Sequence, residues 1–332
     1  MTNSVRDYRG STRRRLLIGT VASIGGGLAL PAFSRGYPEK PIRWLVPYNA
    51  GGATDVSARA IAEGLAAALG QSILVDNRPG GAGRVATQAL LAAPADGYTV
   101  MTADNSILYN NWALFDKLPY TPESFDYVAM TGSFPLVLAV NKNVASTFEG
   151  WRQWLKRNSG QAGFGSPGVG SPHHIAWSLL ADRMGVQLQH VPYKGDSAVI
   201  VDLVSGQIPM ALLGVGNALQ FAKDPRLSFI SVIWPSRLSA MPSVPTFDEV
   251  GVRNFDVTAE QGLLSAAGTP KSIVERLNLE VARVLKTQSV REKLETIGMY
   301  SVFKSPDEFK AHARKQAIQA GQIIKAHGIT VS

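Results

Sequence analysis

Short apolar runs alternate along the chain with segments in which apolar residues recur every three or four positions, a pattern typical of layered α/β proteins. Residues 42–46 predict a strand, and residues 56–69 predict a helix with one apolar stripe. Residues 73–75, 85–92 and 98–102 predict a further strand, helix and strand. We expect this βαβαβ unit to form a parallel sheet with right-handed crossovers.

The alternation continues through the middle of the chain. Strands are predicted at residues 136–140, 210–213 and 229–233, and helices at residues 151–157, 173–184 and 199–204. Ser146 or Thr147 is expected to start the first of these helices, and Asp196 or Ser197 to cap the last.

The C-terminal part predicts one strand and two helices. Residues 255–264 predict the strand, and Thr269-Pro270 predicts the start of the first helix. The sequence Ser305-Pro306-Asp307-Glu308 matches a capping box that opens a helix running to His327.

Two passages of the chain, near residues 136–142 and 252–264, predict two discontinuous lobes joined by two crossover strands. The roughly 298 residues that follow the N-terminal segment exceed one comfortable hydrophobic core. We assign residues 35–137 together with 257–332 to lobe 1, and residues 138–256 to lobe 2.

Residues 1–34 have the composition of an export signal. Arg13-Arg14-Arg15 precedes an apolar stretch, Leu16 to Leu30, that is shorter than the roughly 20 residues needed to cross a bilayer. Residues 12–17 also fit a twin-arginine pattern. We expect cleavage near Ser34 and a periplasmic mature protein, with a retained membrane anchor as the alternative.

Much of the positive charge belongs to this segment. The chain carries 33 Lys and Arg against 25 Asp and Glu, a net charge of +8. Without residues 1–34 the counts are 28 and 24, which leaves +4. A nucleic-acid partner is therefore not expected. The absence of cysteine excludes thiol catalysis and thiolate metal sites.

Two glycine-rich loops lie where a strand is expected to end and a helix to begin. They span residues 48–55 and 163–172. Free backbone N–H groups at a helix start bind anions, and glycine allows the backbone to approach a guest closely. Thr54 and Asp55 are expected to cap the first helix and leave the upstream amides free. The two loops predict a clamp on a small carboxylate, although the first could also be a turn that serves packing alone.

Other kinds of site match less well. Residues 163–168 fit a dinucleotide fingerprint, but Pro167 stands where the helix should open. No Gly-x-Ser-x-Gly elbow occurs. Adjacent residues such as His173 and His174 point in different directions on a helix, so no metal site is expected. Residues 193–196 fit a solvated turn and a pocket wall equally well. No cofactor is expected.

Several segments resemble a known family in order along the mature chain. The matching segments are residues 37–42, 47–55, 77–80, 96–99, 165–173, 190–195, 202–203, 206–207, 244–247 and 267–270. They resemble the tripartite tricarboxylate transporter receptors, also called Bug receptors. The resemblance implies a two-lobed, type II-like periplasmic binding protein fold with two α/β lobes. It also implies a receptor that hands small carboxylates or related organic molecules to an inner-membrane permease.

The expected ligand contacts combine the resemblance with the two loops. In lobe 1 they are Tyr48, Ala50, Gly51, Gly52, Ala53 and Thr54; in lobe 2 they are Ser166, Gly168, Gly170, Ser171, His173 and Asp196. We expect a monomeric extracytoplasmic solute-binding receptor rather than an enzyme. The alternatives are an exported hydrolase or isomerase that uses His173, and a sensor receptor with the same cleft.

One position departs from the family pattern. Many relatives have an aromatic residue, commonly tryptophan, before the glycine of the returning strand, where this chain has Ala259-Glu260-Gln261-Gly262. If Glu260 faces the cleft, it would repel a simple dicarboxylate. The sequence then predicts a ligand with a carboxylate and a hydrogen-bond donor, such as an amino acid, a hydroxy acid or an amide.

Overall fold

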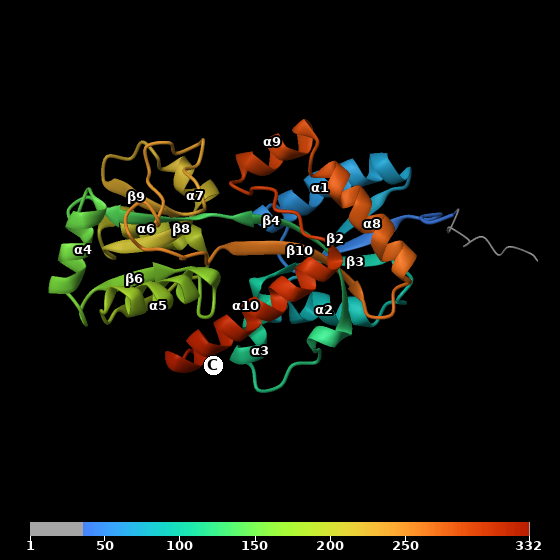
Figure 1. Ribbon diagram of the computed structural model, residues 1–332, viewed down its shortest axis with the longest axis horizontal. Helices are drawn as coiled ribbons and strands as arrows, with labels where there is room; N and C mark the ends of the chain where they lie inside the picture. The colour runs from blue at the N-terminus through green and yellow to red at the C-terminus, as the bar shows by residue number, and fades with distance from the viewer. Residues whose placement is uncertain (1–35, 332) are drawn as a thin grey trace, which may run out of the picture. The chain divides into compact units, whose positions relative to one another are not determined.

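The computed structural model describes residues 36–331, which contain two five-stranded mixed sheets (Figure 1). The strands of the first sheet are β1 (Ile42–Val46), β2 (Ile73–Asn77), β3 (Thr99–Asp104), β4 (Phe125–Phe134) and β10 (Ala259–Ala266). Those of the second are β5 (Leu136–Asn141), β6 (Gly163–Ser166), β7 (Gln189–Pro192), β8 (Met210–Gly214) and β9 (Leu227–Ile233). The expected export signal lies outside the described residues.

Helices accompany both sheets. In lobe 1 they are α1 (Ala53–Leu69), α2 (Arg84–Leu91), α3 (Asn111–Leu114), α8 (Lys271–Val284), α9 (Gln288–Thr296) and α10 (Pro306–Ala326), with short turns η1 (Gly81–Gly83), η2 (Ser106–Asn110) and η3 (Pro122–Ser124). In lobe 2 they are α4 (Phe148–Arg157), α5 (Pro172–Met184), α6 (Asp196–Ser205) and α7 (Val215–Gln220). None of the helices within residues 36–331 is long and apolar enough to cross a membrane.

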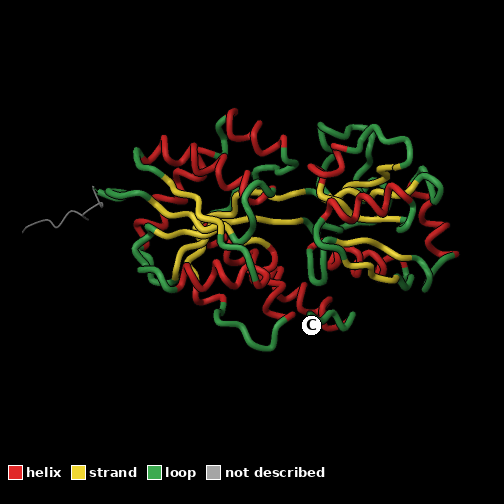
Figure 2. Tube along the Cα trace, turned by 180° about the vertical axis from the view of Figure 1, so that it is seen from behind, coloured by secondary structure: helices red, strands yellow, loops and turns green. Residues whose placement is uncertain are grey.

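The two sheets share one plan. Their strand orders are β2-β1-β3-β10-β4 and β7-β6-β8-β5-β9, with three parallel strands followed by an antiparallel one in each. The antiparallel fourth strand of each sheet, β10 or β5, comes directly from the other lobe, and Figure 2 shows extended segments joining the two groups of strands. The expected α/β fold with two crossover strands is confirmed. Strand pairing puts the first passage at Pro135, and the lobe boundaries at 137/138 and 256/257 remain our proposal.

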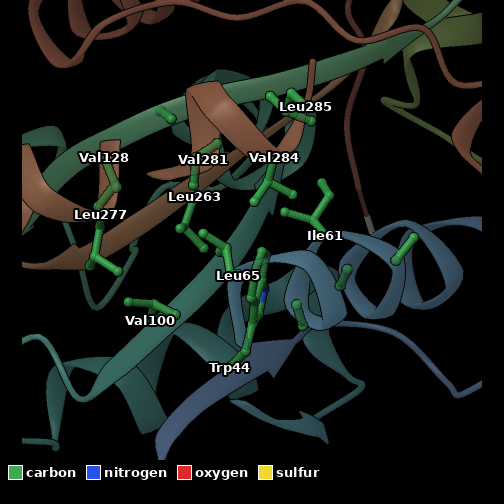
Figure 3. Close-up of a cluster of buried hydrophobic side chains, with 14 of the residues drawn as sticks. Trp44, Ile61, Leu65, Val100, Val128, Leu263, Leu277, Val281, Val284 and Leu285 are labelled. Atoms are coloured by element: carbon green, nitrogen blue, oxygen red, sulfur yellow. The ribbon is translucent and has the colours of Figure 1, made fainter. Parts of the chain in front are cut away.

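The core of lobe 1 lies on both faces of its sheet. Trp44 and Val46 pack with α1 and α8 on one face, whereas the intervening Leu45 packs with α2 and α10 on the other. Figure 3 shows Trp44 with Leu65, Leu277 and other apolar side chains of the first face. Since successive strand residues point to opposite faces, burial of all three shows that both faces are covered.

Lobe 2 is built in the same way. Alternate residues of β5 divide between two clusters: Leu136, Leu138 and Val140 pack with the helix residues Trp151 and Trp177, while the residues between them face α6 and α7. Both lobes are therefore layered, with apolar clusters on both faces of the sheet. What varies between them is carried by the loops at the ends of their strands.

Local sequence signals placed several helix ends correctly, whereas α8 is capped by Pro270 and not by Thr269 as expected. Thr147 caps α4 by accepting a hydrogen bond from the Gly150 amide, and Ser305 forms the expected capping box with Glu308. The sequence did not predict β4 or the helical segment 106–114. The expected strand at 255–264 begins only at Ala259.

Candidate functional site

A cavity of about 780 Å³ lies where the carboxyl ends of the parallel strands of both sheets meet. This edge is where doubly wound α/β proteins bind ligands. Nine of the residues expected from the sequence border the cavity, namely Tyr48, Gly51, Gly52, Ala53, Thr54, Ser171, His173, Asp196 and Glu260. Among the described residues, the other four expected contacts, Ala50, Ser166, Gly168 and Gly170, do not line it.

A second cavity, of about 410 Å³, is bordered by Trp234, Phe255, Lys304 and His312. No helix of eight or more residues begins among its described lining residues. The larger cavity, by contrast, receives the starts of α1, α5 and α6. The larger cavity is therefore the better candidate for binding a charged ligand.

The first helix starts at the cavity wall. Gly52 is the N-cap of α1 and provides no side-chain cap, so the first-turn amides of Ala53 and Thr54 have no acceptor within the helix. The expected cap at Thr54 and Asp55 is wrong by two to three residues. Asp55 instead sits in the first turn and accepts a hydrogen bond from the Gly51 amide, 2.8 Å away.

Asp55 fixes the loop between β1 and α1. Its buried carboxylate also accepts hydrogen bonds from Arg59, at 3.0 Å, and from Asn77, at 2.9 Å. Burial opposes ionisation, but the hydrogen bonds from Arg59, Gly51 and Asn77 outweigh it and lower the pKa of Asp55 below its ordinary value. The loop therefore reaches the cavity with a fixed shape.

The hydroxyl of Tyr48 is already used within lobe 1. It donates to Asp104, whose other oxygen accepts from the amides of Ser106 and Ile107. Burial raises the pKa of Tyr48, and burial also raises the pKa of Asp104 despite these hydrogen bonds. Tyr48 thus lines the cavity without a proton to offer a ligand.

The amides of the second glycine loop are consumed inside lobe 2. The Gly168 amide donates to the Ser166 hydroxyl, and the Gly170 amide donates to Nδ1 of His174. The Ser171 amide donates to the Gly168 carbonyl. The expectation of free amides in residues 166–170 is therefore not supported for Gly168 and Gly170, because the nearby side chains of Ser166 and His174 accept from them.

His174 and His190 hold this loop from behind. Their rings stack at 3.7 Å, and Nε2 of His190 is 2.7 Å from the Ser166 hydroxyl. Burial lowers the pKa of His174 to about 3 and that of His190 to about 4. Both imidazoles are therefore neutral at neutral pH. No group of three His, Cys, Asp or Glu residues within the described chain could hold a metal ion.

Helix α5 begins at Ser171, whose hydroxyl oxygen accepts from the His174 amide at 3.3 Å. Pro172 has no N–H, so His173 carries the first amide of this helix that can reach the cavity. The His173 side chain is only 9% exposed, and neither ring nitrogen has a hydrogen-bond partner among the described residues.

Helix α6 begins one residue earlier than expected. Its N-cap is Gly195, which provides no side-chain cap, so neither Asp196 nor Ser197 is the cap. The first-turn amides of both residues therefore have no acceptor within the helix. The Asp196 carboxylate is also not needed for capping, and it accepts from Asn217 at 2.7 Å.

Glu260 and Gln261 have different partners on the returning strand. The buried Glu260 carboxylate accepts from Tyr109 at 2.8 Å and lies 2.8 Å from Nε2 of His312. The side-chain nitrogen of Gln261 donates to the Thr54 hydroxyl at 2.7 Å, and its side-chain oxygen accepts from the Ser57 hydroxyl at 2.8 Å. Both partners lie at the start of α1. Glu260 borders the cavity, as the prediction about dicarboxylates required, and its carboxylate is already hydrogen bonded to Tyr109 and His312.

Several cavity residues were missed by the sequence analysis. They are Asp104, Asn105 and Ser106 after β3, Ser197 in α6, Asn217 in α7, and Gln261 in β10. The sequence offered one usable signal: each follows or ends a strand on the same sheet edge as the glycine loops, or lies on the returning strand. The directions of their side chains could not be predicted without knowing the register of the strands.

The lobes contact each other beside the cavity. Gly216 of α7 lies so close to the chain after α9 that a Cβ atom there would be 2.2 Å from the Ile297 carbonyl oxygen. Elsewhere, the Asn110 side-chain amide donates to the Gly170 carbonyl at 2.9 Å, and His327 lies 2.9 Å from Asp182. These contacts bring the starts of α1 and α6 to one shared space.

Comparison with known proteins gives consistent matches over nearly the whole chain. Residues 57–329 match the family described as the tripartite tricarboxylate transporter family receptor. A UPF0065 protein from the tcbD–tcbE intergenic region of Pseudomonas sp. strain P51 is 33% identical over 300 residues, covering 89% of this chain and 88% of that protein. Protein BugT of Bordetella pertussis is 28% identical over 320 residues, covering 96% and 98%.

Solved structures agree with this fold. Rpa4515 of R. palustris, determined with adipate, is 27% identical with a TM-score of 0.77 and covers 89% of this chain and 100% of its own. MatC of Rhodopseudomonas palustris, determined with bound malate, is 27% identical with a TM-score of 0.72 and covers 87% and 100%.

Proposed function

Because the chain belongs to the tripartite tricarboxylate transporter receptor family, we propose that it captures a small organic carboxylate between its lobes and delivers it to a membrane permease. The family is one of periplasmic solute-binding receptors, not enzymes, as expected from the sequence. The two similar proteins determined with adipate and with malate support a small organic acid as the ligand. Export to the periplasm after removal of residues 1–34 is part of this proposal.

One observation carries the proposal: helices α1 and α6, from different lobes, point uncapped N-termini at the same cavity. Each N-terminus combines free amides with the positive end of a helix dipole. No Lys or Arg borders the cavity within the described chain. The carboxylate would therefore be bound by backbone rather than by a counter-ion.

The available donors are sufficient for useful affinity. Capture at micromolar concentration needs about 8 kcal/mol, and each hydrogen bond to a charged group contributes roughly 1.5–3 kcal/mol. We assign one end of the ligand to the amides of Gly52, Ala53 and Thr54, and the other to Ser171, His173, Asp196 and Ser197. Contact with both lobes would favour the closed arrangement, because only a ligand that distinguishes two states shifts their balance.

Small carboxylates should stabilise the protein against heat. For a chain of residues 35–332, a ligand at 100 times its Kd adds about 2.7 kcal/mol, which corresponds to a rise in Tm of about 4 °C. A thermal-shift screen of mono- and dicarboxylates and amino acids measures this. The uncharged amide of each acid is screened beside it as the control. Failure of every carboxylate contradicts the proposal, and NMR showing conversion of the ligand would favour the exported enzyme instead.

Ala53→Pro tests the backbone donors directly. Ala53 is the first helical residue of α1 and follows a Gly52 in extended conformation, so proline fits there and removes one N–H. We expect the Kd for the best carboxylate to rise about 10-fold, since about 1.5 kcal/mol is lost, with Tm unchanged without ligand. Gln288→Pro, at the first position of α9 and outside the cavity, is the matched control. Unchanged affinity in Ala53→Pro would remove this amide from the site.

A further inference from the structure

Three carboxylates border the cavity, and one of them differs from the other two. Asp104 is hydrogen bonded by Tyr48 and two backbone amides, and Glu260 by Tyr109 and His312. Asp196 has a single hydrogen bond, from Asn217 to Oδ2. Its Oδ1 is buried and has no hydrogen-bond partner among the described residues.

A ring nitrogen of His173 lies near this oxygen. Nε2 of His173 lies 3.6 Å from Oδ1 of Asp196, beyond a normal hydrogen bond. Burial lowers the pKa of His173, although the nearby Asp196 charge acts in the opposite direction. The imidazole is therefore neutral at neutral pH and leaves the negative charge of Asp196 uncompensated.

A carboxylate at the cavity wall whose oxygens still have free lone pairs favours a ligand that carries a hydrogen-bond donor. An ionised carboxylate has about four lone-pair sites and no proton to give. A second negative charge placed there would meet repulsion, whereas an ammonium or hydroxyl group would supply the missing hydrogen bond. The uncapped start of α1 lies across the cavity and can hold the carboxylate of the same ligand.

We propose that Asp196, with His173 beside it, is a specificity-determining subsite for a hydrogen-bond donor, so that the preferred ligand is an amino- or hydroxy-carboxylate. This inference rests on the proposed function, because it places the second polar group of the captured acid. It keeps the ligand class first suggested by Glu260 but assigns the discrimination to a different residue in the other lobe.

Asp196 also lies in the first turn of α6, where the negative charge of an acidic side chain interacts favourably with the helix dipole and stabilises the helix. A purely structural role would change stability without changing the choice of ligand. The deciding readout is therefore the ratio of affinities within a matched ligand set, measured together with Tm. That ratio is independent of a uniform loss of binding.

Calorimetry on the wild type, Asp196→Asn and Asp202→Asn tests the subsite with three matched sets. These are succinate, malate and aspartate; glutarate, 2-hydroxyglutarate and glutamate; and propionate, lactate and alanine. Asparagine keeps the shape and the Asn217 contact but removes the charge. Asp202 is on the same helix, accepts from Tyr193 at 2.7 Å and lies outside the cavity, so its variant controls for long-range charge.

In the wild type we expect an amino or hydroxy acid to bind at least about 10-fold more tightly than its unsubstituted analogue. Asp196→Asn should bring that ratio close to one, and Asp202→Asn should leave it unchanged. Comparison of the amino acids with the hydroxy acids in each set identifies whether the subsite prefers an ammonium or a hydroxyl group. Equal wild-type affinities, or a ratio that survives Asp196→Asn, overturn the inference while the receptor function stands. If no acid in any set binds, the proposed function fails and the inference with it.

Discussion

Replacing Asp55 with alanine is expected to lower the free energy of unfolding by about 3 kcal/mol and to abolish measurable ligand binding. The carboxylate joins the Gly51 amide, Arg59 and Asn77 in one buried cluster. Hydrogen bonds to a charged group contribute roughly 1.5–3 kcal/mol each, but Arg59 is half exposed and its share is smaller. Urea unfolding and calorimetry with the best carboxylate measure the two effects.

The stabilisation by Asp55 should disappear in acid. The pKa of Asp55 is lower in the folded protein than its unfolded value of about 3.9. The contribution is therefore complete above pH 4 to 5 and is lost as the pH falls through the folded pKa. The difference in unfolding free energy between wild type and Asp55→Ala should shrink between pH 7 and pH 3. A difference that stays constant would mean that the ionised form is not what stabilises the loop.

Asp55→Asn separates charge from shape. The amide can still accept from Gly51 through its oxygen, but it cannot pair with Arg59. We expect a smaller loss of stability than in Asp55→Ala at neutral pH, and a similar decrease of that loss as the pH falls below 5, because neither variant titrates at this position. If both variants bind ligand like the wild type, the loop before α1 does not need this carboxylate to hold its amides in place.

The sequence predicted the parts of the fold that depend on local chemistry. The capping box at Ser305, the cap at Thr147 and the glycine that ends α5 all act within a few residues of their own position. The strand β4 was missed because nearly all of its residues are buried, so it lacks the alternation of polar and apolar positions that marks a half-exposed strand.

The candidate site was predictable at the level of loops and not of atoms. Helix starts after strands identify the edge of each sheet where a ligand binds, and this needs only the order of elements. Which amides remain free depends on the orientation of side chains a few residues away, which the sequence does not give: His174 takes the Gly170 amide, and Asp55 takes that of Gly51. Whether Glu260 or Gln261 contacts the start of α1 depends on which face of β10 each side chain points from. The sequence alone does not fix the strand register that decides this.

Gly216→Ala is expected to weaken ligand binding by up to about 100-fold while leaving the fold intact. A Cβ at this position would lie 2.2 Å from the carbonyl oxygen of Ile297 and 3.3 Å from the amide nitrogen of Gly298. Both are backbone atoms of lobe 1, whereas α7 packs on the sheet of lobe 2. Moving the lobes apart relieves this clash, so the variant should disfavour the arrangement in which Gly216 meets Ile297.

Ligand-free stability should change little in this variant, since the crossover strands allow separation and alanine suits a helix better than glycine. Overpacking of the closed arrangement by up to about 3 kcal/mol converts to roughly 100-fold in affinity.

Gly321→Ala in α10 is the matched control, because its Cβ would meet the nearest atom at an ordinary 3.8 Å. Calorimetry gives the affinity, and small-angle scattering should show a wild-type radius of gyration that falls with ligand and a Gly216→Ala value that does not. Wild-type affinity in Gly216→Ala would show that ligand capture does not require the lobes to meet at Ile297, and the clamp would then have to close elsewhere.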